Sequence, residues 1–125
     1  MARPSQILVS QLLEIERVVQ ARRVVGEFYG EQRVRYHEGL TDCGFELFTG
    51  DGGFYHWGRL PGAITAREFN QRLFEHKAAI LPGPLTDVLR RGDDGPNGDF
   101  IRFSFGPILP ETYENNMAII KTCLP

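Results

Sequence analysis

The chain has 125 residues, enough for one domain with one hydrophobic core, and we expect a single domain over residues 1–125. With 42% hydrophobic and 24% charged residues it has the composition of an ordinary globular protein, and its net charge of -2 lacks the basic excess typical of nucleic-acid binding. No apolar run approaches the roughly 20 residues that a membrane span requires, and the N-terminus has no signal-peptide core, so we expect a cytoplasmic protein without membrane or nucleic-acid partners.

The first part of the chain, residues 1–40, is predicted to be a helical lead-in to the rest of the domain. A short helix over residues 5–13 is followed by a longer one over about 14–39. Gly26 and Gly30 weaken the longer helix, each by roughly 1 kcal/mol relative to alanine. Its apolar residues recur at steps of seven and four, which places them on one face: Val18, Val25, Tyr29, Tyr36 and Leu40.

The sheet-and-helix part of the domain, residues 45–123, begins with two strands. Residues 45–48 form a short strand, and the aromatic stretch 54–60 is β-prone. The glycine-rich residues 49–53 form the turn between them, and Pro61 ends the second strand.

A well-marked helix follows. Thr65 and Glu68 have the spacing of a capping box, in which each side chain bonds the other residue's backbone N–H. Ile64 and Phe69 occupy the positions of a hydrophobic staple across the helix start. We therefore expect a helix that begins after Thr65, with the basic residues 76–77 in its last turn.

The remaining elements are shorter. Residues 78–81 are predicted to be a buried strand, 86–91 one or two helical turns, and 92–98 a mobile surface loop. Residues 99–105 form the last strand, and Pro110 opens a final helix. The apolar stripe of that helix is Tyr113, Met117, Ile120 and Leu124. This order predicts an α+β fold, with a small sheet of three or four strands and helices packed on one face.

The last strand contains an arginine between aromatic residues, in the sequence "DFIRFSFG" over 99–106. Alternation along a strand places Phe100, Arg102 and Ser104 on one face and the other apolar residues on the opposite face. A guanidinium group keeps its charge, so Arg102 needs an anion if this strand is covered. Two interpretations stay open at this point. Arg102 is either a surface or edge-strand arginine paired with a carboxylate of the chain, or an arginine held for a carboxylate or phosphate ligand.

Other groups of reactive residues give weaker signals. The three histidines, His37, His56 and His76, have no metal-ligand spacing, so we expect no metal site. The two cysteines, Cys43 and Cys123, form no CxxC pattern and are expected to be free thiols.

Several stretches together resemble one protein family. They are "DGGFYHWGRLP" (51–61), "TAREFNQRLFEHKAAILPG" (65–83) and "GDFIRFSFG" (98–106), in this order and at this spacing. They resemble the C-terminal small domain of fold-type I pyridoxal-phosphate (PLP) enzymes, and within these the class I/II aminotransferases. The resemblance extends over about residues 5–123, and it implies an aminotransferase small-domain-like fold.

The resemblance also implies a function. Arg102 matches the family's arginine that binds the α-carboxylate of the amino-acid substrate. The chain would then be the substrate-carboxylate-binding domain of a PLP-dependent aminotransferase, which moves an amino group between an amino acid and a 2-oxo acid. The intact enzyme would hold PLP and be a homodimer.

The family's Schiff-base lysine has no counterpart here. The only lysines, Lys77 and Lys121, resemble surface groups and lack the small hydroxyl residues that precede the family's lysine. We therefore expect the PLP-binding large domain to be missing, as in a fragment or the product of a truncated or split gene. The isolated chain would be inactive, with no catalytic residue, no metal and no tightly bound cofactor of its own.

Two alternatives stay open. One is a non-catalytic α+β module for binding or interaction. The other is part of a PLP-dependent decarboxylase or lyase of the same fold.

Overall fold

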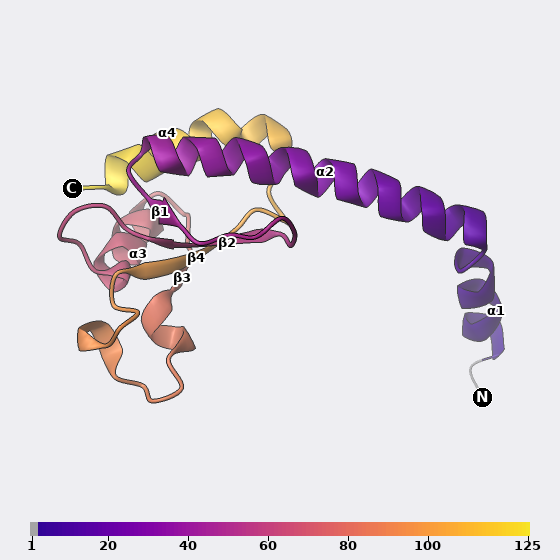
Figure 1. The fold of residues 1–125 in the computed structure, drawn as a ribbon, viewed down its shortest axis with the longest axis horizontal. Helices are drawn as coiled ribbons and strands as arrows, with labels where there is room; N and C mark the ends of the chain where they lie inside the picture. Colours follow the sequence, from indigo (N-terminus) through magenta and orange to yellow (C-terminus); the bar gives the residue numbers. More distant parts are fainter. Residues whose placement is uncertain (1–2) are drawn as a thin grey trace.

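Four antiparallel strands form a small sheet in the order β1-β2-β4-β3 (Figure 1). The computed structural model describes residues 3–125. The strands are β1 (Glu46–Leu47), β2 (Tyr55–Arg59), β3 (Leu81–Pro82) and β4 (Phe100–Ser104). The two long strands, β2 and β4, lie side by side in the middle of the sheet, and the two short strands are its edges.

Four α-helices accompany the sheet: α1 (Arg3–Leu12), α2 (Ile15–Asp42), α3 (Ala66–Glu75) and α4 (Tyr113–Cys123). The C-terminal part of α2 and the whole of α4 lie along the same side of the sheet (Figure 1). Helix α3 packs against α4 and against the edge strand β3. The predicted α+β fold with helices on one face of the sheet is thus confirmed. Among residues 3–125, no helix is long and apolar enough to cross a membrane.

The core lies between the sheet and these helices. Along β4 and just beyond it, Ile101, Phe103 and Phe105 are buried, while the residues between them are more exposed. The ring of Phe103 packs against Tyr36 of α2, with 4.9 Å between the ring centroids. The alternation predicted for this strand is therefore confirmed, because its apolar side faces the helices.

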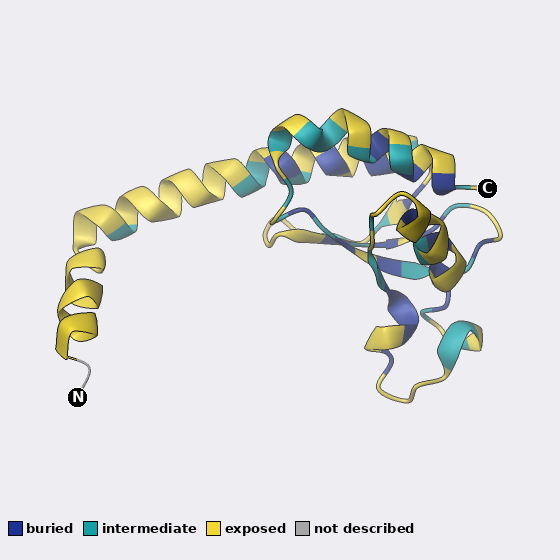
Figure 2. Ribbon diagram, turned by 180° about the vertical axis from the view of Figure 1, so that it is seen from behind, coloured by how far each residue is buried: buried dark blue, intermediate teal, exposed yellow. Residues whose placement is uncertain are grey.

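The N-terminal arm, which we define as residues 3–31, extends away from the rest of the molecule (Figure 1). Almost all of the arm is exposed (Figure 2), and α2 becomes buried only toward its C-terminal end. The buried residues of α2 are Gln32, Tyr36, Gly39 and Leu40. The predicted apolar face of this helix is covered only at that end, and Val25 on the same face is 50% exposed. Helical periodicity identifies an apolar face, but it does not say how much of the face the chain itself covers.

Some predicted boundaries are wrong. The strand predicted over 78–81 shares only Leu81 with β3, because the backbone before it bonds to α3 and not to a strand: Ala78 N–H donates to the carbonyl of Leu73, and Ile80 N–H donates to Asn70 Oδ1. After Pro82 the chain enters a 3-10 helix, η1 (Gly83–Thr86). The helical turn predicted over 86–91 is this 3-10 helix, η1, which begins three residues earlier and ends at Thr86. The predicted loop after them contains a second 3-10 helix, η2 (Gly92–Asp94), and the final helix is preceded by a third, η3 (Pro110–Thr112).

The helix ends follow local rules. At the start of α3 the predicted capping box is present: Glu68 N–H donates to Thr65 Oγ1 at 3.2 Å, and Thr65 N–H donates to Glu68 Oε2 at 3.0 Å. Helices α2 and α3 end in the same way, with one residue of positive φ just past the helix. That residue is Gly44 (φ 88) after α2, but Lys77 (φ 59) after α3.

Candidate functional site

Arg102 lies in the middle of the sheet, on β4. Its backbone faces Trp57 of β2 on one side and Leu81 of β3 on the other, so β4 is an interior strand and the interpretation of Arg102 as an edge-strand residue is wrong. The side chain of Arg102 is exposed, on the face of the sheet opposite the core. We call this surface the open face, and its strand residues are Glu46, Tyr55, Trp57, Arg59, Leu81, Phe100, Arg102 and Ser104.

The guanidinium of Arg102 has an aromatic neighbour but no anionic one. Its central carbon lies 5.5 Å from the centroid of the Tyr55 ring, a cation–π contact across the two central strands. Among residues 3–125, no carboxylate forms an ion pair with Arg102 and its side chain donates no hydrogen bond. The interpretation of Arg102 as paired within the chain is therefore wrong for the described residues. Its planar set of N–H donors can receive a carboxylate through two parallel hydrogen bonds.

The other arginine on the open face is in the opposite situation. Arg59 Nη1 donates to Glu46 Oε2 at 2.8 Å, and Arg59 Nε lies 3.3 Å from Asp99 Oδ2. Its guanidinium also lies over the ring of Phe100, 4.8 Å from the centroid. Arg59 therefore forms ion pairs within the chain, and two carboxylates balance its charge.

Aromatic side chains surround these two arginines. The Trp57 ring stacks on Phe100, with 5.3 Å between centroids and an interplanar angle of 17°. Phe48, just after β1, lies 5.7 Å from the same Phe100 ring and is itself 51% exposed. The open face is thus an aromatic surface, with one arginine balanced by carboxylates and one without an anionic partner in the described chain.

His56, from β2, points to the other side of the sheet and is fully buried. Its Nε2 lies 3.0 Å from the backbone oxygen of Arg33, and its Nδ1 lies 2.8 Å from Thr49 Oγ1. A neutral ring satisfies both contacts, with Nε2–H donating and Nδ1 accepting. Burial lowers the pKa of His56 to about 4, with the nearby charge of His37 adding to the effect. His56 is therefore a core residue that joins α2 to the turn before β2.

The histidines do not form a metal centre. The ring centroids of His37 and His56 lie 5.7 Å apart. Their spacing in the sequence did not predict this contact, because His37 belongs to α2 and His56 to β2. No group of three or more histidine, cysteine or acidic side chains suited to a metal ion occurs within residues 3–125. Cys43 and Cys123 are free thiols, and burial raises the pKa of each.

The two lysines are far from the arrangement that PLP requires. Lys121 is an exposed residue of α4, and Lys77 is exposed just after α3. Both helices pack on the core side of the sheet, whereas Arg102 lies on the open face. The described residues thus place no amine next to Arg102, and they do not fit PLP.

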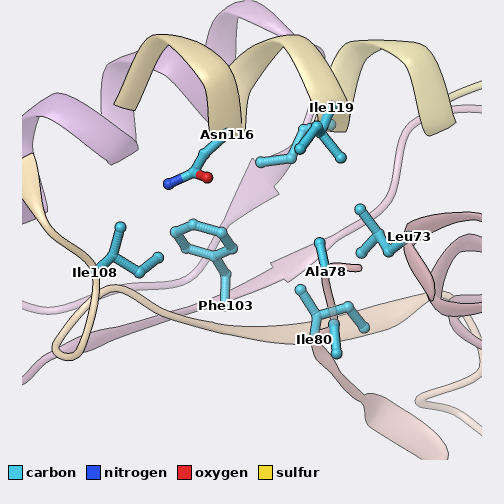
Figure 3. A pocket seen from close by; sticks show the side chains of 9 residues that line it. Leu73, Ala78, Ile80, Phe103, Ile108, Asn116 and Ile119 are labelled. Atoms are coloured by element: carbon cyan, nitrogen blue, oxygen red, sulfur yellow. The ribbon is translucent and has the colours of Figure 1, made fainter. Parts of the chain in front are cut away.

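A small apolar hollow lies on the core side, between α4 and residues 78–80 (Figure 3). Its volume is about 80 Å³, and its polar lining residue, Asn116, donates to Tyr36 Oη and to Thr112 Oγ1. Phe103 forms part of its floor, on the face of β4 opposite to Arg102. The hollow is therefore separate from the surface around Arg102.

No protein-family model matches the sequence, and no curated protein matches it. Solved structures do match. The α-aminoadipate aminotransferase from Thermus thermophilus, complexed with N-(5'-phosphopyridoxyl)-L-leucine, superposes with a TM-score of 0.72 at 23% identity, over 95% of this chain and 30% of that one. A probable N-succinyldiaminopimelate aminotransferase from the same species has a TM-score of 0.64 at 27% identity, over 93% and 28%. The Pyrococcus horikoshii kynurenine aminotransferase has a TM-score of 0.65 at 20% identity, over 78% and 24%.

These similarities show which fold the chain has. The chain has the α+β fold of one part of these aminotransferases, and it spans less than a third of the length of the chains that it matches. It resembles a small domain of an aminotransferase, as the sequence motifs predicted.

Proposed function

We propose that the chain is the C-terminal, substrate-carboxylate-binding domain of a PLP-dependent aminotransferase. The observation that carries this proposal is the position of Arg102. It is an exposed guanidinium without an anionic partner among the described residues, at the centre of an open sheet face, in a fold shared with aminotransferases. A carboxylate is the ligand whose geometry suits such a group best.

The role of Arg102 in this proposal is to position the substrate. Its backbone is fixed by pairing on both sides, with Trp57 and Leu81. Its side chain rests on the ring of Tyr55. A carboxylate bound to a guanidinium held in this way is restricted in orientation, and restricting a reactant is one of the main ways in which enzymes lower a barrier.

The proposal requires a second domain, from the same polypeptide or from another one. The described residues do not fit PLP, so the cofactor and its lysine belong to that domain. The open face and the N-terminal arm both present apolar side chains without a partner, which supports a contact with further protein. We propose that the assembled enzyme is a cytoplasmic homodimer acting on an amino acid and a 2-oxo acid, and that this chain alone is inactive.

The test is an NMR titration of the 15N-labelled chain with 2-oxobutyrate, a small 2-oxo acid with one carboxylate. We expect shifts at Tyr55, Trp57, Arg102 and Ser104, and their loss in Arg102→Gln. Arg90→Gln is the matched control, because Arg90 is an exposed arginine outside the sheet. Shifts that persist in Arg102→Gln, or no shifts at the open face, would contradict the proposal.

A further inference from the structure

We infer that the surface around Arg102 prefers carboxylates with one aromatic or apolar side chain over those with a second carboxylate. This inference rests on the proposed function, since it concerns the substrate that Arg102 would bind. It follows from what lies next to Arg102 on the open face.

The first observation is the aromatic character of this surface. Tyr55 lies against the guanidinium of Arg102 and is 42% exposed, so part of its ring is free to contact a ligand. Trp57 is directly opposite Arg102 in the ladder and is half-buried against Phe100. A carboxylate held by Arg102 therefore brings the rest of its molecule next to aromatic rings, where an apolar or aromatic side chain is stabilised.

The second observation is the lack of another available cation among the strand residues of the open face. Arg59 is the other arginine there, and it is already bound by Glu46 and Asp99. To pair with Arg59, a second carboxylate on the ligand would have to displace one of these two partners. It would also approach two fixed negative charges, which repel it.

The aromatic rings add to this discrimination. The face of an aromatic ring carries partial negative charge, so it attracts cations such as Arg102 and disfavours an anion that lies on it. A dicarboxylate bound at Arg102 that laid its second charge on the surface would place it either over Tyr55 and Trp57 or near Glu46 and Asp99, and neither pair attracts that charge. A second carboxylate directed into solvent would stay hydrated but would gain no contact with the surface.

The test compares two ligands that both offer a 2-oxo acid group. Phenylpyruvate carries an aromatic side chain, and 2-oxoglutarate carries a second carboxylate. The dissociation constants of the 15N-labelled chain for both are measured by NMR, with the Trp57 indole N–H and the Arg102 side-chain N–H as reporters. We expect phenylpyruvate to bind about two- to tenfold more tightly, the range that an aromatic contact contributes.

Two variants identify the origin of the preference. Tyr55→Phe keeps the aromatic ring and should keep the preference for phenylpyruvate. Tyr55→Leu removes the ring, so the ratio of the two dissociation constants should fall toward one. Both replace an exposed side chain, so the fold is retained in either variant.

The outcomes separate the inference from the proposed function. Equal or tighter binding of 2-oxoglutarate, with both ligands lost in Arg102→Gln, would overturn the preference and leave the proposed function intact. Failure of both ligands to shift Arg102 would overturn both. A preference for phenylpyruvate that is unchanged in Tyr55→Leu and in Arg102→Gln would also overturn the inference, since it would place the ligand elsewhere.

Discussion

Arg59 and Arg102 lie on the same face of the same sheet, yet only Arg59 is bound by carboxylates of the described chain. Arg59 contacts Glu46 and Asp99 at 2.8 and 3.3 Å, while Arg102 contacts the ring of Tyr55. A sheet that needed both charges for its own stability would be expected to balance both. The contrast between these two arginines supports a role for Arg102 toward a ligand.

The first prediction concerns the cofactor. Mixed with PLP and treated with borohydride, the chain should form no specific adduct, because Lys77 and Lys121 are exposed amines on the helical side of the sheet. Absorbance spectra of the mixture and mass spectrometry of the borohydride-treated protein show whether a PLP adduct has formed. A stoichiometric adduct on either lysine would show that the chain holds PLP by itself, and Lys77→Arg and Lys121→Arg would identify which lysine carries it.

The second prediction concerns acid stability. The pKa of His56 is about 4 in the folded chain and about 6.5 when the side chain is exposed, so the unfolded state binds the proton more readily. The stabilisation from a neutral His56 is therefore complete above pH 6.5 and is lost as the pH falls toward 4. One pKa unit corresponds to about 1.4 kcal/mol, so the loss should reach at most about 3.5 kcal/mol below pH 4.

Denaturant unfolding at several pH values, compared between the wild-type chain and His56→Gln, measures this loss. Gln offers a donor and an acceptor for Arg33 and Thr49 but does not titrate. The acidic groups are common to both proteins, so the difference between the two curves reports His56. Parallel curves between pH 7 and pH 4.5 would contradict the assignment.

The third prediction concerns the end of α3. Lys77 adopts φ 59 at the position where α2 has Gly44, and a residue with a Cβ is strained there. Lys77→Gly should raise the free energy of unfolding by about 1 kcal/mol, seen as an increase in Tm of about 4 °C. Lys77→Ala is the control, since it removes the same charge but keeps the Cβ. If the glycine and alanine variants were equally stable, the strain at Lys77 would be refuted.

The fourth prediction concerns the N-terminal arm. Its exposed apolar residues include Ile7, Leu8, Leu12, Leu13, Ile15, Val19, Val24, Val25 and Phe28. Without a partner domain this surface should make the isolated chain self-associate, with a mass by light scattering that rises with concentration. The double variant Val24→Lys, Val25→Glu should lower that mass while leaving the circular dichroism of the sheet domain unchanged. A chain that stays monomeric at all concentrations would instead favour a stand-alone binding module.

The sequence predicted much of the fold because several signals were local. The capping box at Thr65 and Glu68 and the alternation along β4 depend on a few neighbouring residues, and both are confirmed. The short β3 was overpredicted, since pairing partners and not local composition decide how far an edge strand extends.

The site was predictable only in part. The motif around Arg102 pointed to this residue, but its contact with Tyr55 depends on the register of β2 and β4, which the sequence does not specify. The pairing of Arg59 with Glu46 depends on the same sheet order. His56 was missed as a core residue because its partners, Thr49 and the carbonyl of Arg33, come from a turn and from the distant α2.

The central claim is that Arg102 binds the carboxylate of the substrate, and the most direct measurement is the dissociation constant of 2-oxobutyrate for the chain and its Arg102→Gln variant. We predict saturable shifts centred on Arg102 in the wild-type chain, abolished in Arg102→Gln and unchanged in Arg90→Gln. Equal binding by the wild-type chain and Arg102→Gln would contradict the claim.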